Sequence, residues 1–532
     1  FAPFHWGAMH LEPGRRALNA ITPNALDPTS KQAELKATAV RIEPSAPGGE
    51  DRRPGRSSRE PRTLVVGAGM AGLRVVESLL DHGVGGASLT LVGEEGELPY
   101  DRVRLPRLLD PAAEASTVRL REPSWFDSHR VTVHAGARVD RIDLAGRRAL
   151  LAGGGELGFD RLVLATGSRA ALPPIPGLER GGVHAFRSLA DARALAATAV
   201  SGAPAVVIGG GLLGLEAARG LQARGMRVTV VHLADRLMEQ QLDPIAAGLL
   251  DRRMRELGIA VELNAQTTEL AGNGRVEGVR LAGGRELEAA LVVVATGIRP
   301  NVELARSAGL DVARGVVVDD EMRTSDGATW AVGDCAEHRG TVQGLVAPAR
   351  RQAQVAAAVL AGRPAAFHGS VPATRLKVMG VELFCAGATA AAPGEDELLL
   401  LDSRNGRYRK LVIAGNRLAG AILVGDLSDA ARLHRTVESG IAVPADLLAA
   451  GAAPAPASGD ELVCSCNSVT RAAIARAVRT GGAGDAAGVA ALTGASTGCG
   501  GCRSEVERIV AGIRDEPGEL ADVRAARAVG RS

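Results

Sequence analysis

Two glycine-rich segments of the pattern G-x-G-x-x-G limit the folds open to this chain more than any other feature of its sequence. The first contains Gly67, Gly69, Met70, Ala71 and Gly72, and the second contains Gly209, Gly211, Leu212 and Gly214. Each follows a short apolar run and precedes a stretch with helical spacing, which predicts a strand, a tight turn and a helix. Such a turn lets a pyrophosphate approach the backbone at the helix N-terminus. The sequence therefore predicts two dinucleotide-binding βαβ modules.

The residues after each fingerprint indicate which nucleotide each module would hold. Glu94 ends the next apolar run after the first fingerprint, where a carboxylate can accept a hydrogen bond from a ribose 2′-hydroxyl. After the second fingerprint, Glu216 lies in the expected helix and the next strand ends in His232. Arg236 follows in the loop and can bind a 2′-phosphate. The choice between NADH and NADPH therefore stays open.

Two further segments match each other, because each is a buried strand that runs into a Thr-Gly turn. They contain Thr166 and Gly167 in the first case, and Thr296 and Gly297 in the second. We expect the chain to cross between the two modules at these turns. A later strand leads to Gly333 and Asp334. A carboxylate at such a position can accept hydrogen bonds from the ribityl or ribose hydroxyls of a flavin.

Composition restricts the partners of the chain. Its 532 residues exceed what one core usually holds, so three or four domains are expected. A net charge of +2 and an aromatic content of 2% give no reason to expect nucleic acid or an anionic membrane as a partner. No apolar stretch is long enough to span a bilayer, and cysteines are few. These features predict a cytoplasmic protein.

Residues 63–365 resemble the flavoprotein disulfide-reductase family, in its branch without a redox disulfide. The resemblance implies that the first module binds FAD, the second binds NAD(P)H, and the segment of Asp334 returns to the flavin. The segment from Tyr100 to Arg107 resembles the family's loop beside the isoalloxazine ring, which implies positions near the flavin for Arg102 and Arg107. No side chain is expected to act as a nucleophile, because the cofactors carry the redox chemistry.

Four of the six cysteines form a C-x-C and C-x-x-C set near the end of the chain: Cys464, Cys466, Cys499 and Cys502. Four converging thiolates suit a [2Fe–2S] cluster or a structural zinc ion. The segment resembles the [2Fe–2S] domain of bacterioferritin-associated ferredoxin (BFD), in its cysteine spacing, in Asn467 and in its glycine-rich approach to the second pair. This resemblance favours the cluster, and a flavoprotein with a zinc-bound tail used for binding or sensing is the alternative.

The order of these parts resembles the N-terminal half of NAD(P)H nitrite reductase large subunits and the electron-transfer subunit of assimilatory nitrate reductases. A nitrite reductase large subunit would continue into a sirohaem domain with four more cysteines, and none follows Cys502. We therefore do not expect nitrite reduction within this sequence. The resemblance implies electron transfer from NAD(P)H to FAD, to the cluster and then to a separate acceptor.

The first 43 residues resemble the C-terminal tail of a molybdopterin nitrate reductase. The matching pieces are Phe4 to Trp6, Asp27 to Lys36 and Val40 to Glu43. Together with a first residue that is not Met, the match predicts a molybdenum nitrate reductase domain fused upstream, which would receive the electrons. The alternative is an NAD(P)H reductase that feeds nitrite reductase or another iron–sulfur acceptor.

The predicted fold class is α/β, with two Rossmann-like modules, a small α+β domain and a small helical [2Fe–2S] domain whose helices are expected at 469–479 and 503–513. The predicted segments are a tail of a molybdopterin-dinucleotide-binding domain (1–45), a linker (46–62), the FAD domain in two parts (63–202 and 319–365), the NAD(P) domain (203–318), the α+β domain (366–449), a second linker (450–460), the [2Fe–2S] domain (461–515) and a tail (516–532).

Overall fold

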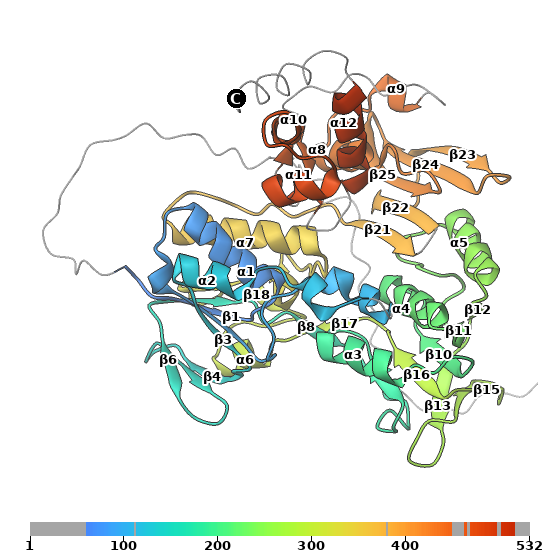
Figure 1. Cartoon of the computed structure of the whole chain (residues 1–532), viewed down its shortest axis with the longest axis horizontal. Helices are drawn as coiled ribbons and strands as arrows, with labels where there is room; N and C mark the ends of the chain where they lie inside the picture. The colour runs from blue at the N-terminus through green and yellow to red at the C-terminus, as the bar shows by residue number, and fades with distance from the viewer. Residues whose placement is uncertain are drawn as a thin grey trace, which may run out of the picture. The chain divides into compact units, whose positions relative to one another are not determined.

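Two parallel sheets, one antiparallel sheet and a small helical segment make up the computed structural model in Figure 1. The structure describes residues 60–110, 113–378, 381–448, 462–464, 469–496 and 502–515. The predicted fold class is confirmed. The predicted tail at 1–45, residues 46–59 of the predicted linker at 46–62, the predicted linker at 450–460 and the predicted tail at 516–532 lie outside the described residues.

The first parallel sheet has the strand order β19-β7-β1-β2-β3. Its strands are β1 (Thr63–Val66), β2 (Leu89–Gly93), β3 (Thr132–Ala135), β7 (Arg161–Leu164) and β19 (Thr329–Ala331). All four residues of β1 are buried, as expected for a central parallel strand covered on both faces. Helix α1 (Met70–Asp81) packs on β1 and β2 and lies along α7 (Val346–Leu360), as Figure 1 shows. The short helix α2 (Pro123–His129) packs beside β3.

The second parallel sheet has the order β12-β11-β10-β16-β9. Its strands are β9 (Val183–Ala185), β10 (Pro204–Ile208), β11 (Arg227–Val231), β12 (Ala260–Glu262) and β16 (Leu291–Val294), and its helices are α3 (Leu189–Thr198), α4 (Leu212–Ala223) and α5 (Pro244–Glu256). The repeat of the βαβ module predicted from the two fingerprints is therefore present. Strand β9 joins this sheet although it precedes the predicted boundary at residue 203.

Small sheets and short helices connect and extend the two modules. They are β4 (Val139–Asp143), β5 (Arg148–Leu151) and β6 (Glu156–Gly158); β13 (Thr267–Ala271), β14 (Gly278–Leu281) and β15 (Glu286–Glu288); β18 (Val316–Val318) and β20 (Ala336–His338); the helix α6 (Glu303–Ser307); and the 3-10 helices η1 (Gly86–Ser88), η2 (Arg102–Leu109), η3 (Ala115–Val118) and η4 (Gly333–Cys335). The two crossing segments pair with each other as antiparallel strands, β8 (Ser168–Ala170) with β17 (Ile298–Pro300).

An antiparallel sheet of order β21-β22-β25-β24-β23 follows the two modules. It comprises β21 (Ala373–Val378), β22 (Val381–Gly387), β23 (Asp396–Asp402), β24 (Arg407–Ala414) and β25 (Arg417–Val424), with α8 (Ala430–Ser439) and α9 (Ala445–Leu448) after it. The α+β character predicted for this region is thus observed. Buried residues of β21, β22, β24 and β25 share one apolar core with the second parallel sheet, so the antiparallel sheet is held against that module.

The C-terminal segment has its own apolar core. It contains β26 (Leu462–Cys464), β27 (Val469–Thr470), α10 (Arg471–Arg479), α11 (Ala486–Thr493) and α12 (Arg503–Asp515). The sequence predicted helices at 469–479 and 503–513, which correspond to α10 and α12. Residues 469 and 470 are a strand instead, because Thr470 caps α10 by accepting a hydrogen bond from the amide of Ala473.

A buried ionic cluster joins the second module to the antiparallel sheet. Asp243 caps the N-terminus of α5, where one carboxylate oxygen accepts a hydrogen bond from the amide of Ala246 at 2.9 Å. The other oxygen accepts one from the hydroxyl of Tyr408 at 2.6 Å and lies 3.4 Å from Nζ of Lys410. Lys410 also contacts Glu397 at 2.8 Å. Burial, and then the bond to Asp243, raises the pKa of Tyr408.

Replacing Asp243 by alanine removes the helix cap, the acceptor of Tyr408 and a buried counter-charge of Lys410. We expect Asp243→Ala to lower the free energy of unfolding by about 3–5 kcal/mol, because a buried partner is lost. Urea denaturation followed by circular dichroism measures the change. The control is Glu288→Ala, whose side chain is 74% exposed in its pair with Arg227, and which should cost under about 0.5 kcal/mol. Equal losses in the two variants would refute this account of the junction.

Candidate cofactor sites

Two glycines of the first fingerprint occupy positions that no other residue type would fit. Gly67 follows β1 with a φ of 117°, and a Cβ on it would lie 2.0 Å from the carbonyl oxygen of Ala165. A Cβ on Gly72 would lie 1.9 Å from the carbonyl oxygen of Gly67. Both distances are far inside van der Waals contact. These two glycines are therefore required for α1 to start directly against the end of β1.

Gly69, the middle glycine of the fingerprint, is not crowded by other residues but faces open space. Gly69 is the N-cap of α1, has no side-chain cap, and a Cβ on it would meet nothing within 4 Å. Protein packing therefore does not require a glycine here. A ligand approaching the uncapped amides of the helix would require it, since the first turn, with Met70 and Ala71, leaves its N–H groups without helical partners. The turn fits the pyrophosphate of a dinucleotide.

The second fingerprint repeats this geometry. Gly209 has a φ of 119°, and a Cβ on it would lie 2.3 Å from the carbonyl oxygen of Ala295. A Cβ on Gly214 would lie 2.1 Å from the carbonyl oxygen of Gly209. Gly211 is the uncapped N-cap of α4, which begins at Leu212, and faces open space. The second turn therefore also fits a pyrophosphate.

Two residues predicted for FAD lie at the same end of the first sheet as its glycine turn. Glu94 directly follows β2, and its side chain is exposed. Gly333 starts η4 after β19, and a Cβ on it would lie 2.9 Å from Cβ of Ala71 in the first turn of α1. Its amide donates to Oε1 of Gln352 in α7 at 2.8 Å. The structure thus brings Asp334 next to the N-terminus of α1.

The carboxylate of Asp334 is held by two residues that the sequence did not indicate. Its Oδ2 accepts a hydrogen bond from Nη2 of Arg187 at 2.6 Å and another from the hydroxyl of Ser168 at 2.8 Å. Arg187 also donates to that hydroxyl at 2.6 Å. Arg187 follows β9 and Ser168 starts β8, so neither lies near Asp334 in the sequence. No motif marks either residue, and only the three-dimensional fold brings them together.

Arg102 is bound within the protein rather than left open for a ligand. Its Nη1 donates to the carbonyl oxygen of Arg187 at 3.1 Å, its Nη2 pairs with Glu95, and its guanidinium lies 5.0 Å from the centre of the Tyr100 ring. The hydroxyl of Tyr100 donates to Glu95 at 2.6 Å. Together with Asp334 these groups form one continuous polar network, in which Arg102 supports the loop that carries it.

Arg107 lies on η2, and its side chain is exposed. Partial burial, followed by the charges of Arg104 and Arg503, lowers the pKa of its guanidinium. Arg503 is the first residue of α12 and directly follows Cys502. The side of η2 that carries Arg107 therefore faces the C-terminal segment.

A second contact links the first module to the C-terminal segment. Ala347 belongs to the first turn of α7 and packs against the apolar core of that segment. The same helix supplies Gln352 to the segment of Asp334, as described above. Helix α7 therefore contacts both the segment of Asp334, where the flavin is expected, and the C-terminal segment, where the cluster is expected.

Hydrogen bonds link the two turns at which the chain crosses between the modules. The hydroxyl of Thr166 donates to the carbonyl oxygen of Asn301 at 2.8 Å, and the side-chain amide of Asn301 donates back to the carbonyl oxygen of Thr166 at 2.9 Å. Gly167 and Gly297 both have positive φ, at 66° and 110°. The expected crossing of the chain at these turns agrees with the structure.

The loop after β11 does not leave Arg236 open to bind a 2′-phosphate, a role that the sequence had suggested. Arg236 donates to the carbonyl oxygens of Leu242 and Glu239 at 3.2 and 3.3 Å, and to Asp235 at 2.9 Å. All three contacts lie within its own loop. The guanidinium is therefore engaged with the protein and does not reach out as a phosphate clamp would.

His232 instead connects the glycine turn to a carboxylate. Its Nδ1 accepts a hydrogen bond from the amide of Gly210 at 3.1 Å, so Nε2 carries the proton and donates to Glu239 at 3.0 Å. Glu239 therefore places an acid beside the strand end where NAD sites usually carry one. Sequence reasoning missed Glu239, because it lies seven residues beyond His232 and only the folded loop brings the two side chains together.

Glu216 lies one turn into α4, and the pKa of its carboxyl group is raised. Burial raises the pKa of its carboxyl to about 8. The folded protein thus favours the protonated form at neutral pH. Its helix packs on η2, where Gly220 of α4 leaves room for Leu109.

Two of the four predicted cluster ligands lie among the described residues. Cys464 and Cys502 are 3% and 6% exposed, and neither forms a disulfide. A hydrogen bond with the Cys464 side chain, followed by burial, raises the pKa of the Cys502 thiol, so the two sulfur atoms are neighbours. Two converging buried thiols fit one side of a [2Fe–2S] cluster. Cys466 and Cys499 lie outside the described residues.

Three family models match consecutive parts of the chain. Residues 61–362 match the pyridine nucleotide-disulphide oxidoreductase family, residues 372–441 the rubredoxin NAD+ reductase C-terminal domain, and residues 462–512 the BFD-like [2Fe–2S] binding domain. The first match alone covers more than half of the chain. These matches show the domains that bind FAD, NAD(P)H and a [2Fe–2S] cluster.

Curated relatives and a solved structure agree with these families. The chain is 38% identical to nitrite reductase [NAD(P)H] of Bacillus subtilis over 84% of its own length and 57% of that protein. It is 35% identical to the assimilatory nitrate reductase electron transfer subunit of the same organism, over 85% and 60%. It thus spans little more than half of these relatives. The putidaredoxin reductase–putidaredoxin complex matches with a TM-score of 0.69 and 27% identity, over 74% of this chain and 97% of that one.

The two glycine turns and the network around Asp334 lie within the residues that match the first family, and the buried cysteine pair lies within those that match the third. The chain therefore belongs to the pyridine nucleotide-disulphide oxidoreductase family, as an FAD-dependent NAD(P)H oxidoreductase with a BFD-like [2Fe–2S] domain, similar to nitrite reductases and to a nitrate reductase electron transfer subunit.

Proposed function

We propose that this chain carries electrons from NADH through FAD to a [2Fe–2S] cluster and delivers them to a molybdenum nitrate reductase. The observation that carries the proposal is the presence of two equivalent open glycine turns and a buried cysteine pair in one chain. Packing of Ala347 of α7 against the apolar core of the C-terminal segment supports a short path between flavin and cluster. FAD, when bound, couples the two-electron donor NADH to one-electron acceptors.

The chain's own residues bind and orient the cofactors in this proposal. We assign the FAD pyrophosphate to the amides of α1 that follow Gly69, and a ribose of FAD to Glu94. Asp334 lies in the segment of the chain that returns to the flavin. Arg187 and Ser168 hold one oxygen of Asp334, so its other oxygen, Oδ1, is the acceptor we assign to a flavin hydroxyl. The remaining FAD residues of this assignment are Gly67, Met70, Ala71, Gly72, Arg107, Thr166, Gly167 and Gly333, while Arg102 supports its loop through Glu95 and the carbonyl oxygen of Arg187.

The second module holds the nicotinamide nucleotide in the same manner. We assign its pyrophosphate to the amides of α4 behind Gly211, with Gly209, Leu212, Gly214, Glu216, His232 and Gly297 around it, while Arg236 stays bound to its own loop. The cluster is assigned to Cys464, Cys466, Cys499 and Cys502. The convergence of Cys464 with Cys502, one from each sequence pair, supports a single site for all four.

Nitrate as the final acceptor rests on the first 43 residues and on one relative. Those residues resemble a nitrate reductase tail, and they lie outside the described residues. The electron transfer subunit of Bacillus subtilis covers 85% of this chain and is named for nitrate assimilation. Delivery to nitrite reductase is the second candidate, favoured by the 38% identity to a nitrite reductase. A molybdopterin domain encoded upstream of Phe1 would decide for nitrate, and its absence would refute the fusion.

A cytoplasmic location is part of the proposal. Among the described residues, no helix is both long enough and apolar enough to cross a membrane. The cysteines among them form no disulfide, as expected in a reducing compartment.

The cofactor assignment is tested by the absorption spectrum of the purified chain. We expect flavin bands and a broad visible absorption from the cluster, with about two iron atoms per chain. Addition of NADH in the absence of oxygen should bleach both absorptions. Cys502→Ser should remove the cluster absorption and leave reduction of the flavin unchanged. Cys385→Ser is the control, because Cys385 is a free cysteine with the same 6% exposure, located in β22. Zinc without iron in the wild type would overturn the proposal.

Alanine at the two open glycines separates the two nucleotide sites. A methyl group at Gly69 or Gly211 meets no protein atom, so both variants should fold. We expect Gly69→Ala to weaken FAD binding by about 10- to 100-fold, because the lost close approach is worth about 1–3 kcal/mol. Gly211→Ala should keep its FAD and raise KM for NADH by a similar factor. Flavin content and steady-state kinetics measure the two effects, and loss of FAD from both variants would contradict the assignment.

Preference for NADH follows from the loop after β11. Glu239 lies beside the expected ribose and Arg236 is engaged elsewhere, so a 2′-phosphate would meet a negative charge. We expect kcat/KM for NADH to exceed that for NADPH by at least about tenfold, equivalent to about 1.4 kcal/mol. Glu239→Gln should reduce this ratio, whereas Glu256→Gln on α5 should not change it. An equal use of both nucleotides by the wild type would show that Glu239 does not select.

A further inference from the structure

The outer edge of the antiparallel sheet carries a row of exposed leucines. Strand β23 ends the order of this sheet, and in the described part of the chain it pairs with β24 alone (Figure 1). Leu399, Leu400 and Leu401 of β23 are 47%, 40% and 54% exposed. Successive side chains of a strand point to opposite faces of its sheet. Both faces of this edge are therefore open at the leucines.

The backbone of β23 is open along the same edge. The strand pairs with β24 without a register shift, from Asp396 opposite Ile413 to Asp402 opposite Arg407. In an antiparallel edge strand, every second residue directs its N–H and C=O groups away from the sheet. Seven residues in one unbroken register thus form a continuous template, to which a further strand can add by backbone hydrogen bonds.

The features that usually protect an edge strand are missing from the middle of β23. Proline, lysine and β-bulges prevent further pairing of natural edges, and residues 396–402 contain none of the three. The charged residues of the strand stand at its two ends. The opposite edge of the sheet differs, because β21 carries Arg375 and Lys377 and lies beside α4. The exposed leucines are therefore confined to the less protected edge.

Acidic residues dominate the start of the strand. Glu395, Asp396 and Glu397 are consecutive in the sequence, and Asp396 is exposed. Lys410 contacts Glu397 at 2.8 Å, but it shares its charge with Asp243 at 3.4 Å. Opposite charges across a strand pair stabilise a sheet. An added strand would therefore gain from a lysine or arginine beside Asp396.

The same charges disfavour a second copy of this strand as the occupant. Antiparallel pairing of two copies about Leu399 would place Asp396 of each copy opposite Asp402 of the other. Like charges directly opposite each other destabilise a sheet. A strand from a different protein, with a cation at its C-terminal end, would bring opposite charges together at the same place. The edge therefore favours a different chain.

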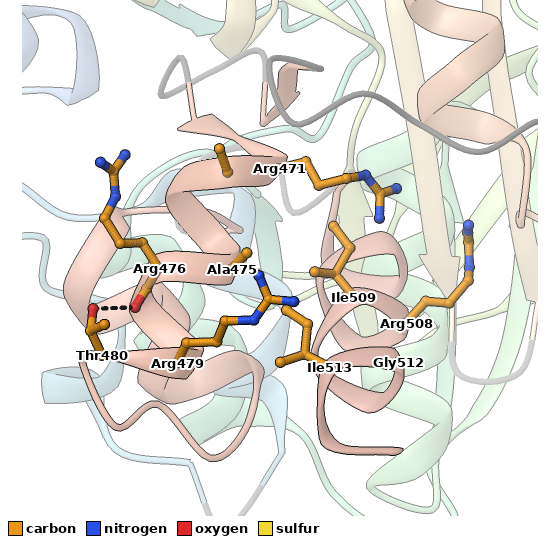
Figure 2. A pocket seen from close by; sticks show the side chains of 10 residues that line it. Arg471, Ala475, Arg476, Arg479, Thr480, Arg508, Ile509, Gly512 and Ile513 are labelled. Carbon is orange, nitrogen blue, oxygen red and sulfur yellow. Dashed lines mark hydrogen bonds between the residues drawn. The ribbon is translucent and has the colours of Figure 1, made fainter. Parts of the chain in front are cut away.

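The groove between α10 and α12 differs from this edge, because its polar groups are engaged within the C-terminal segment. Its volume is about 640 Å³, and Figure 2 shows the side chains that line it. Arg471 and Arg508 both pair with Glu505, the latter at 2.6 Å. The hydroxyl of Thr480 donates to the carbonyl oxygen of Arg476 at 2.8 Å. The leucines of β23, by contrast, expose apolar surface to solvent.

We propose that β23 is a docking edge for an extended segment of another protein, which adds to the sheet as a strand antiparallel to β23. This segment has aliphatic side chains against the leucines and a lysine or arginine at its C-terminal end, beside Asp396. Backbone hydrogen bonds supply affinity, and the side chains supply specificity. The inference goes beyond the proposed function and does not depend on it, because none of the assigned cofactor residues lies in β23.

A fluorescein-labelled peptide of sequence Thr-Val-Thr-Val-Thr-Val-Lys-Lys is the probe, titrated into the cofactor-loaded chain and followed by fluorescence anisotropy. We expect it to bind at least about tenfold more tightly than the same peptide ending in Glu-Glu, because its lysines meet the acidic start of β23. Failure of both peptides to bind would overturn the proposal.

Leu400→Thr tests the apolar part of the edge. Threonine keeps a high strand propensity but removes aliphatic surface, so binding of the lysine-ended peptide should weaken by about fivefold or more. The matched control is Val317→Thr in β18, because Val317 is also 40% exposed. It should leave binding within about twofold of the wild type. Equal weakening in the two variants would show that β23 is not the docking edge.

Asp396→Lys tests the charge and the direction of the added strand. In this variant the glutamate-ended peptide should bind more tightly than the lysine-ended one, which reverses the order seen in the wild type. Glu288→Lys is the control, because it changes the net charge equally on β15, the edge strand of another sheet. It should keep the wild-type order. An unchanged order in Asp396→Lys would contradict the proposed orientation.

Sedimentation velocity distinguishes the other possible occupant. A wild-type dimer that Leu400→Thr converts to a monomer would overturn the proposal, by placing a second copy of the chain on the edge. Circular dichroism should show the wild-type fold in every variant, so that weaker binding reports on the edge itself. Bleaching of the cofactors by NADH should be unchanged in Leu400→Thr and Asp396→Lys. The docking edge and the electron path can therefore fail independently.

Discussion

The close approach of a helix to the end of its preceding strand is the constraint on which the rest of this structure depends. At Gly67 and Gly72, and again at Gly209 and Gly214, a single methyl group would collide with backbone atoms about 2 Å away. This contact sets the direction in which α1 and α4 leave their sheets. It also leaves the first amides of each helix uncapped, so the same steric requirement that fixes the fold creates the binding sites.

The network around Asp334 connects the parts that the glycine turns position. Arg187 follows β9 of the second sheet and Ser168 lies in the crossing strand β8, yet both bond to Asp334 at the end of the first sheet. Arg102 then joins Arg187 to Glu95. The two modules are therefore coupled by hydrogen bonds at the expected flavin site itself. A relative movement of the modules would change the orientation of Asp334.

The sequence predicted what depends on short-range patterns and missed what depends on distant contacts. The glycine turns and the helices after them are local, and their positions agree with the structure. Arg187 and Glu239 were missed because their partners are recognised only after folding. Arg236 was weighed as a phosphate ligand, whereas its loop folds back so that its own carbonyl oxygens bind the guanidinium. Helix α11 was missed because its alanine-rich sequence lacks a clear apolar face.

Helix α12 both follows a cluster ligand and holds its neighbouring helix α10 in place. It starts at the residue after Cys502, and Glu505 within it fixes Arg471 of α10. Burial of Glu505 strengthens these pairs, since a buried charge without partners would be strongly unfavourable. The spacing of α10 and α12 is therefore set by the segment that also carries the predicted cluster ligand Cys502.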